Sequence, residues 1–207
     1  MATGRSTSPH VVPGQTGLVP GQLAVIEAVR AVWNLVGEQH LENFAVVGGA
    51  AFLFYGASVW TSDADIATTA QSFKAFEAAA NQDSRFACTV GCYWEYKSSM
   101  DILVQLDFLD KDGVGGCLHK LRGYTLVDGV PMATLSDLAV AKGTAWVDRE
   151  KEKDFLGLEY AVHAMTRKGM NFRELEEDGR ERLDDILEEL EQDERGRSLA
   201  RVIRTLQ

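Results

Sequence analysis

The sequence predicts an α/β (α+β) fold, in which a small mixed β-sheet flanked by helices is followed by a C-terminal helical region. Two observations support this prediction: short apolar runs alternate with helical repeats up to about residue 133, and the chain beyond that point has helical spacing. With 207 residues, of which 45% are hydrophobic and 25% charged, the chain is long enough for one domain or a core with a smaller appended one. We expect a flexible N-terminal tail at 1–22, an α/β core at 23–133 and a helical region at 134–207.

The elements of the core follow from periodicity and from turn residues. Residues 1–22 hold three of the four prolines, which favours a tail, and helical spacing then begins at Leu23 and stops at Gly37. A buried strand at 44–47 ends in a glycine pair and leads into a helix at 50–55. Further strands are expected at 65–67, 86–90, 93–97 and 101–109, with an alanine-rich helix at 71–81.

The end of the core and the helical region carry specific local signals. Asp128-Gly129 predicts a two-residue hairpin between strands at 124–127 and 130–132. Thr134 and Asp137 form a capping box that opens a helix through residue 145 or beyond. Helices are also expected at 158–165, 175–190 and 199–206.

Charge and composition exclude several classes of protein. The net charge of −10 arises in residues 174–194, where twelve acidic residues face two arginines, so binding to duplex nucleic acid is disfavoured. This acidic segment is either a solvated helix face or a docking surface for a basic partner. Three cysteines and four scattered histidines lack the spacing of a metal site. No apolar run reaches the roughly 20 residues that span a bilayer, and we expect a cytoplasmic protein without membrane contact.

A glycine pair and an acidic pair carry the chemistry of the core. Gly48 and Gly49 lie where a strand turns directly into a helix, so backbone N–H groups there can approach an anion, although such a pair also suits a purely structural turn. In an extended strand, Asp63 and Asp65 project to the same face. Two adjacent carboxylates suit Mg²⁺ beside phosphate oxygens, whereas the alternative is a surface turn or helix cap.

The order and spacing of Gly48-Gly49, Gly56 and Thr61-x-Asp63-x-Asp65 resemble the DNA-polymerase-β-like nucleotidyltransferase superfamily. The similarity is strongest to its minimal members, such as AbiEii-type toxins and antibiotic nucleotidyltransferases. The resemblance implies that the glycines and Thr61 contact the nucleotide, and that Asp63, Asp65 and a third acid on a later strand bind the metal and catalyse the reaction.

Asp107 and Asp101 compete for the role of third acid. Both have the same strand parity, and we favour Asp107 because it lies between hydrophobic neighbours inside the strand, whereas Asp101 lies at its start.

A cationic block extends the resemblance as far as residue 158. Lys142, Arg149 and Lys153 are 7 and 4 residues apart, so on one continuous helix they would share a face within about 40°. Such a face would supply positive charge to a triphosphate. The alternative is a solvated helix whose cations pair with nearby acids, namely Asp148, Glu150, Glu152 and Asp154.

The resemblance implies a metal-dependent transferase that moves a nucleoside monophosphate from a triphosphate, such as ATP, to a hydroxyl of a small-molecule acceptor. A protein or transfer RNA acceptor stays open. Relatives often carry an arginine where this chain has Val59. Because of this difference a second alternative stays open, in which the chain is a non-catalytic binding module or uses the same pocket for another small molecule. The aromatic residues Tyr93, Trp94 and Tyr96 could stack on a base, although packing in the core is the simpler use.

Overall fold

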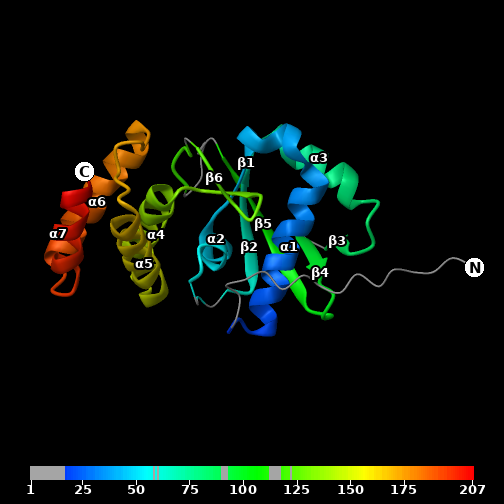
Figure 1. Ribbon diagram of the computed structural model, residues 1–207, viewed down its shortest axis with the longest axis horizontal. Coiled ribbons are helices and arrows are strands. Elements are labelled where there is room, and N and C mark those ends of the chain that lie inside the picture. The colour runs from blue at the N-terminus through cyan, green and yellow to red at the C-terminus, as the bar shows by residue number, and fades with distance from the viewer. Residues whose placement is uncertain (1–16, 58, 60, 90–92, 112–117, 122) are drawn as a thin grey trace, which may run out of the picture.

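The computed structural model describes residues 17–57, 59, 61–89, 93–111, 118–121 and 123–207. A seven-stranded mixed sheet with flanking helices is followed by helices that extend to one side of it, as the sequence predicted (Figure 1). The strands are β1 (Phe44–Val46), β2 (Asp63–Thr68), β3 (Phe86–Cys88), β4 (Trp94–Lys97), β5 (Leu103–Asp110), β6 (Thr125–Val127) and β7 (Val130–Met132). The helices are α1 (Pro20–Val36), the 3-10 helix η1 (Glu38–Asn43), α2 (Gly48–Phe54), α3 (Ala70–Ala80), α4 (Leu135–Arg149), α5 (Glu152–Lys168), α6 (Glu177–Gln192) and α7 (Gly196–Leu206).

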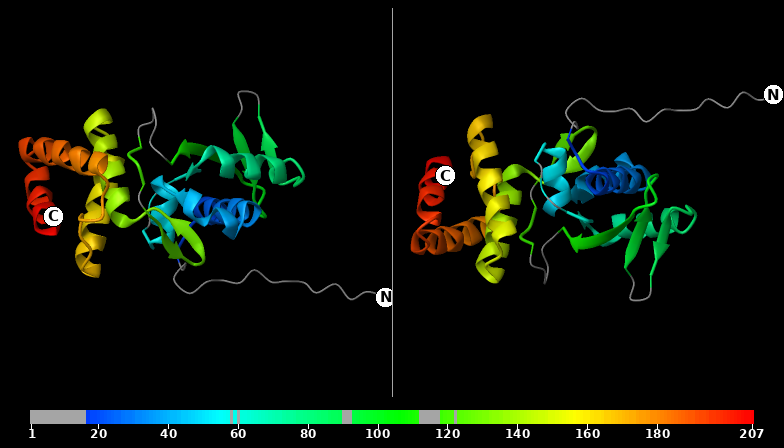
Figure 2. Two further views of the ribbon diagram at one scale, coloured as in Figure 1. Left: turned by 90° about the horizontal axis from the view of Figure 1, so that it is seen from above. Right: turned by 90° about the horizontal axis from the view of Figure 1, so that it is seen from below.

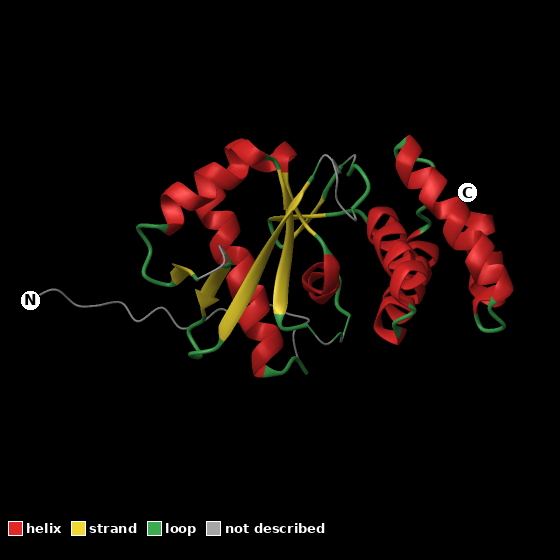
Figure 3. Cartoon of the chain, turned by 180° about the vertical axis from the view of Figure 1, so that it is seen from behind, coloured by secondary structure: helices red, strands yellow, loops and turns green. Residues whose placement is uncertain are grey.

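The sheet has the order β3-β4-β5-β2-β1-β7-β6, with β2 and β5 side by side near its middle (Figure 3). The β2–β5 and β1–β7 pairs are parallel, and the other neighbours are antiparallel. β6 and β7 form the predicted hairpin, because Asp128 and Gly129 both have the positive φ, 52° and 77°, that its turn requires.

The two faces of the sheet differ in character. On one face, Trp94 and Tyr96 of β4 are buried; Phe76 of α3 stacks edge-on against Trp94, and the Tyr96 hydroxyl donates to Glu27 of α1 at 2.8 Å. Helices α1 and α3 therefore cover this face. Because side chains alternate along a strand, the opposite face carries the polar residues of β2 and β5.

The C-terminal helices form a second layer of packing, in which α4 and α5 lie between the sheet and the α6–α7 pair (Figure 2). Thr134 caps α4 as predicted by accepting from the Asp137 N–H at 3.1 Å. α6 buries Leu183, Ile186 and Leu190 and turns most of its acidic side chains to solvent. None of the helices in the described part of the chain is both long and apolar enough to cross a membrane.

Several predicted boundaries were wrong. α1 begins at Pro20 instead of residue 23, because proline suits a first helical turn and the Gln22 side chain accepts from the Val19 N–H at 2.9 Å. β2 begins at Asp63, and β3 ends at Cys88, whereas residue 90 lies outside the described residues, as do residues 1–16 of the expected tail. Residues 142–153 do not form the single continuous helix on which a shared cationic face depended: Glu150, at φ 52°, ends α4, and α5 starts separately.

Candidate active site

Three aspartates meet on the face of the sheet opposite α1 and α3. Asp63 and Asp65 lie on β2, Asp107 lies on the parallel neighbour β5, and Asp65 and Asp107 face each other in the strand register. Each of the three offers a carboxylate oxygen, and these oxygens all lie within 4.8 Å of one another. Asp101 is elsewhere, in an exposed turn before β5, where its carboxylate lies 2.6 Å from the Lys97 ammonium.

Gly48 brings the turn between β1 and α2 against this cluster. The N–H of Val47 donates to the carbonyl of Asp65 at 3.0 Å, which ties the turn to β2. Gly48 has φ +60°, and a Cβ built on it would lie 1.8 Å from Oδ2 of Asp65. Only glycine fits here, because a side chain would be strained and would also displace the carboxylate.

Gly49 and Thr61 form a second contact between the turn and the cluster. A Cβ on Gly49 would lie 2.7 Å from both Cβ and Oγ1 of Thr61. The buried Thr61 hydroxyl donates to Oδ1 of Asp63 at 2.7 Å. The orientation of Asp63 is thus fixed by a hydroxyl that packs against the glycine pair.

The cluster carries excess negative charge. Burial, followed by the charge of Asp63, raises the pKa of the Asp65 carboxyl from 3.8 to about 6, and Asp107 acts in the same direction. The charges of Lys142 and Lys153 oppose this rise without cancelling it. Carboxylates crowded in this way are stabilised by a divalent cation, and hard oxygen donors are the ligands that Mg²⁺ prefers.

The cationic block is only partly directed at the aspartates. Asp154 is fully buried and accepts from Lys142 Nζ at 3.0 Å and from Arg149 Nη2 at 2.9 Å. Lys142 and Arg149 therefore pair with a nearby acid, which is the alternative that the sequence left open. Lys142 and the exposed Lys153 are still near enough to Asp65 to act on its pKa, although α4 and α5 are separate helices.

Sequence reasoning missed Gln105, the partner of the third acid. Its Nε2 donates to Oδ1 of Asp107 at 2.7 Å, and it faces Asp63 in the register. Strand alternation could have identified Gln105, since residues 105 and 107 project to the same face of one strand.

The remaining candidates lie apart from the aspartates or contribute to packing. Trp94 and Tyr96 are core residues, whereas Tyr93 is exposed. Val59 packs partly buried against the core, and its carbonyl accepts from the Gln22 amide at 2.7 Å.

Comparisons with solved structures show the fold. An antigenic nucleotidyltransferase-like protein from Paracoccidioides brasiliensis superimposes with a TM-score of 0.59 at 17% identity, covering 87% of this chain and 91% of that one. The antibiotic-resistance factor ANT(2'')-Ia matches with a TM-score of 0.44 at 12% identity, over 70% of this chain and 84% of its own. No protein-family model matches the sequence, and no curated protein matches it either. The chain therefore shares the fold of the Paracoccidioides protein.

Proposed function

We propose that this chain is a divalent-metal-dependent nucleotidyltransferase that moves a nucleoside monophosphate from a triphosphate, such as ATP, to a hydroxyl of a small-molecule acceptor. The observation that carries the proposal is the cluster of Asp63, Asp65 and Asp107 on adjacent parallel strands. All three aspartates are only partly buried, which is consistent with access of a substrate to their carboxylates. The shared fold agrees with this activity.

The residues fit a bound Mg²⁺ in two respects. They supply three hard carboxylate donors whose oxygens lie within 4.8 Å of one another, and the raised pKa of Asp65 marks negative charge that a cation would neutralise. When bound by these aspartates, Mg²⁺ would supply positive charge to the triphosphate oxygens during transfer.

The protein residues then have distinct roles. The acceptor oxygen attacks the α-phosphorus, its proton passes to the Asp107 carboxylate, and the bond to the β-phosphate oxygen breaks to release pyrophosphate. Gln105 occupies Oδ1 of Asp107 and thereby orients the second oxygen for the proton. Thr61 orients Asp63 in the same manner.

The nucleotide would be held by backbone and cations together. Gly48 and Gly49 have no side chain between the turn and the acidic cluster, so their N–H groups can approach the phosphates. Lys142 and Lys153 would contribute positive charge to the triphosphate. Arg149, which like Lys142 forms an ion pair with Asp154, would add to this charge. The proposed core at 23–133 and helical region at 134–207 would thus both contact the nucleotide.

Calorimetric titration tests the proposal. Mg²⁺ complexes of ATP, GTP, CTP and UTP are titrated into the wild type, an Asp63→Ala/Asp65→Ala double variant and an Asp101→Ala control, whose aspartate lies at an exposed turn. We expect one or more triphosphates to bind wild type and control but not the double variant, and the preferred nucleotide to release pyrophosphate with a hydroxyl-bearing acceptor. If no triphosphate binds the folded wild type, the proposal fails.

A further inference from the structure

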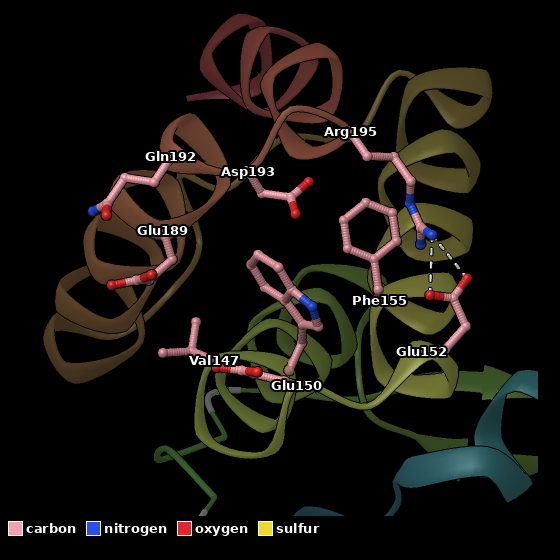
Figure 4. Close-up of a pocket in the computed structure, with 9 residues that line it drawn as sticks. Val147, Glu150, Glu152, Phe155, Glu189, Gln192, Asp193 and Arg195 are labelled. Carbon is pink, nitrogen blue, oxygen red and sulfur yellow. Dashed lines mark hydrogen bonds and ion pairs between the residues drawn. The ribbon is translucent and has the colours of Figure 1, made fainter.

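A cavity of about 490 Å³ lies among the C-terminal helices. It is open to solvent on one side and is lined by the end of α4, the first turns of α5, the end of α6 and the turn between α6 and α7 (Figure 4). None of the three clustered aspartates lines it. Its volume falls within the range of roughly 300–1,000 Å³ that is typical of small-molecule sites.

The charge of this cavity is strongly unbalanced. Four carboxylates line it, from Glu150, Glu152, Glu189 and Asp193, against the single guanidinium of Arg195. Figure 4 shows the Asp193 carboxylate directed into the space, with Glu189 on α6 across from Arg195. Among the residues that the structure describes, neither Glu150 nor Glu189 is paired with a cation.

The cavity also has an aromatic wall that already holds a cation. The rings of Trp146 and Phe155 pack edge to face with their centroids 5.4 Å apart. The Arg195 guanidinium carbon lies 3.9 Å from the centroid of the Phe155 ring, and its Nη1 lies 2.9 Å from Glu152. A ring face together with a carboxylate is the arrangement by which proteins recognise organic cations.

We propose that this cavity binds a small organic cation, a protonated amine or guanidinium carried on a short aliphatic chain. The cation would lie among Glu150, Glu189 and Asp193, and its apolar part would contact Trp146. At the ring of Phe155 the ligand competes with Arg195, whose side chain is 53% exposed and therefore borders solvent. The proposal depends on this cavity alone and stands independently of nucleotide transfer.

Calorimetric titration of the full chain at low ionic strength tests it, because salt screens such charges. The probes are putrescine and agmatine, with 1,4-butanediol as the neutral analogue. We expect Kd values at or below about 1 mM for the two cations and no measurable binding of the diol. Glu189→Gln should weaken binding about threefold through the loss of one charge pair, whereas Glu188→Gln, which makes the same change on α6 outside the cavity, should not.

Arg195→Ala gives a test with the opposite sign. Removal of the guanidinium frees the Phe155 ring and Glu152, so agmatine should bind at least about threefold more tightly. Circular dichroism of each variant confirms that it is folded. The proposal is overturned if the wild type binds neither cation, if the diol binds equally well, if Glu188→Gln weakens binding as much as Glu189→Gln, or if Arg195→Ala weakens it.

Discussion

Asp65→Asn should stabilise the metal-free protein near neutral pH. The Asp65 carboxyl is placed where its charged form is unfavourable, because it is buried and lies beside Asp63 and Asp107. Asparagine has nearly the same shape and no charge. Since the pKa of Asp65 in the folded protein exceeds its unfolded value, the folded state binds more protons between the two, and the free energy of unfolding falls as the pH rises through that range.

The size of the effect follows from the shift. A rise of the pKa from 3.8 to about 6 corresponds to about 3 kcal/mol, at about 1.4 kcal/mol for each pH unit. We therefore expect wild type and Asp65→Asn to have similar stability below about pH 4, and the variant to become more stable by about 3 kcal/mol as the pH passes about 6.

Urea denaturation followed by circular dichroism in EDTA, at pH values from 4 to 8, measures this difference. Asp101→Asn is the matched control, since Lys97 lowers the pKa of that exposed carboxyl and its loss should not stabilise the protein. Equal stability of wild type and Asp65→Asn at pH 8, or a difference that does not change with pH, would refute the reasoning. Added Mg²⁺ should stabilise the wild type and not the variant.

Two further substitutions test the surroundings of the cluster. Gly48→Ala should abolish Mg²⁺–triphosphate binding in calorimetry, because its Cβ would lie 1.8 Å from the Asp65 carboxylate. Gly56→Ala, which also places alanine at a positive φ (+88°) but in open space, should retain binding. Equal loss in both would show that strain alone is responsible. Asp154→Asn should lower the free energy of unfolding by about 1–3 kcal/mol, because the buried side chain loses its charge-assisted hydrogen bonds from Lys142 and Arg149, and Asp148→Asn at an exposed position should change it little. A small effect of Asp154→Asn in thermal and urea denaturation would contradict a structural role for the pair.

Local signals in the sequence predicted most elements of the fold. The hairpin followed from Asp128-Gly129, the start of α4 from Thr134, and the buried strand β1 from a short apolar run. The end of α4 could not be predicted, because Glu150 adopts a left-handed conformation that ordinarily favours glycine. The order of the strands depends on contacts between distant segments, which periodicity does not record.

For the candidate site, too, local patterns could be predicted from the sequence, whereas contacts between distant segments could not. Alternation along a strand placed Asp63 and Asp65 on one face, and the same rule applied to Asp107. The proximity of Gly48 to Asp65, however, arises from pairing between β1 and β2. Likewise, the sequence shows several acids near Lys142, and only packing of α4 against α5 selects Asp154 as its partner.

The pairing of Asp65 with Asp107 across β2 and β5 limits how this chain can change in length. Insertion or deletion of one residue within either strand would turn the following carboxylate to the face covered by α1 and α3. A change of two residues would keep the face and move the carboxylate about 7 Å along the strand, away from its neighbour. Changes in length compatible with the cluster are therefore confined to the connections between elements, where the chain can diversify while the spacing of its acids stays constant.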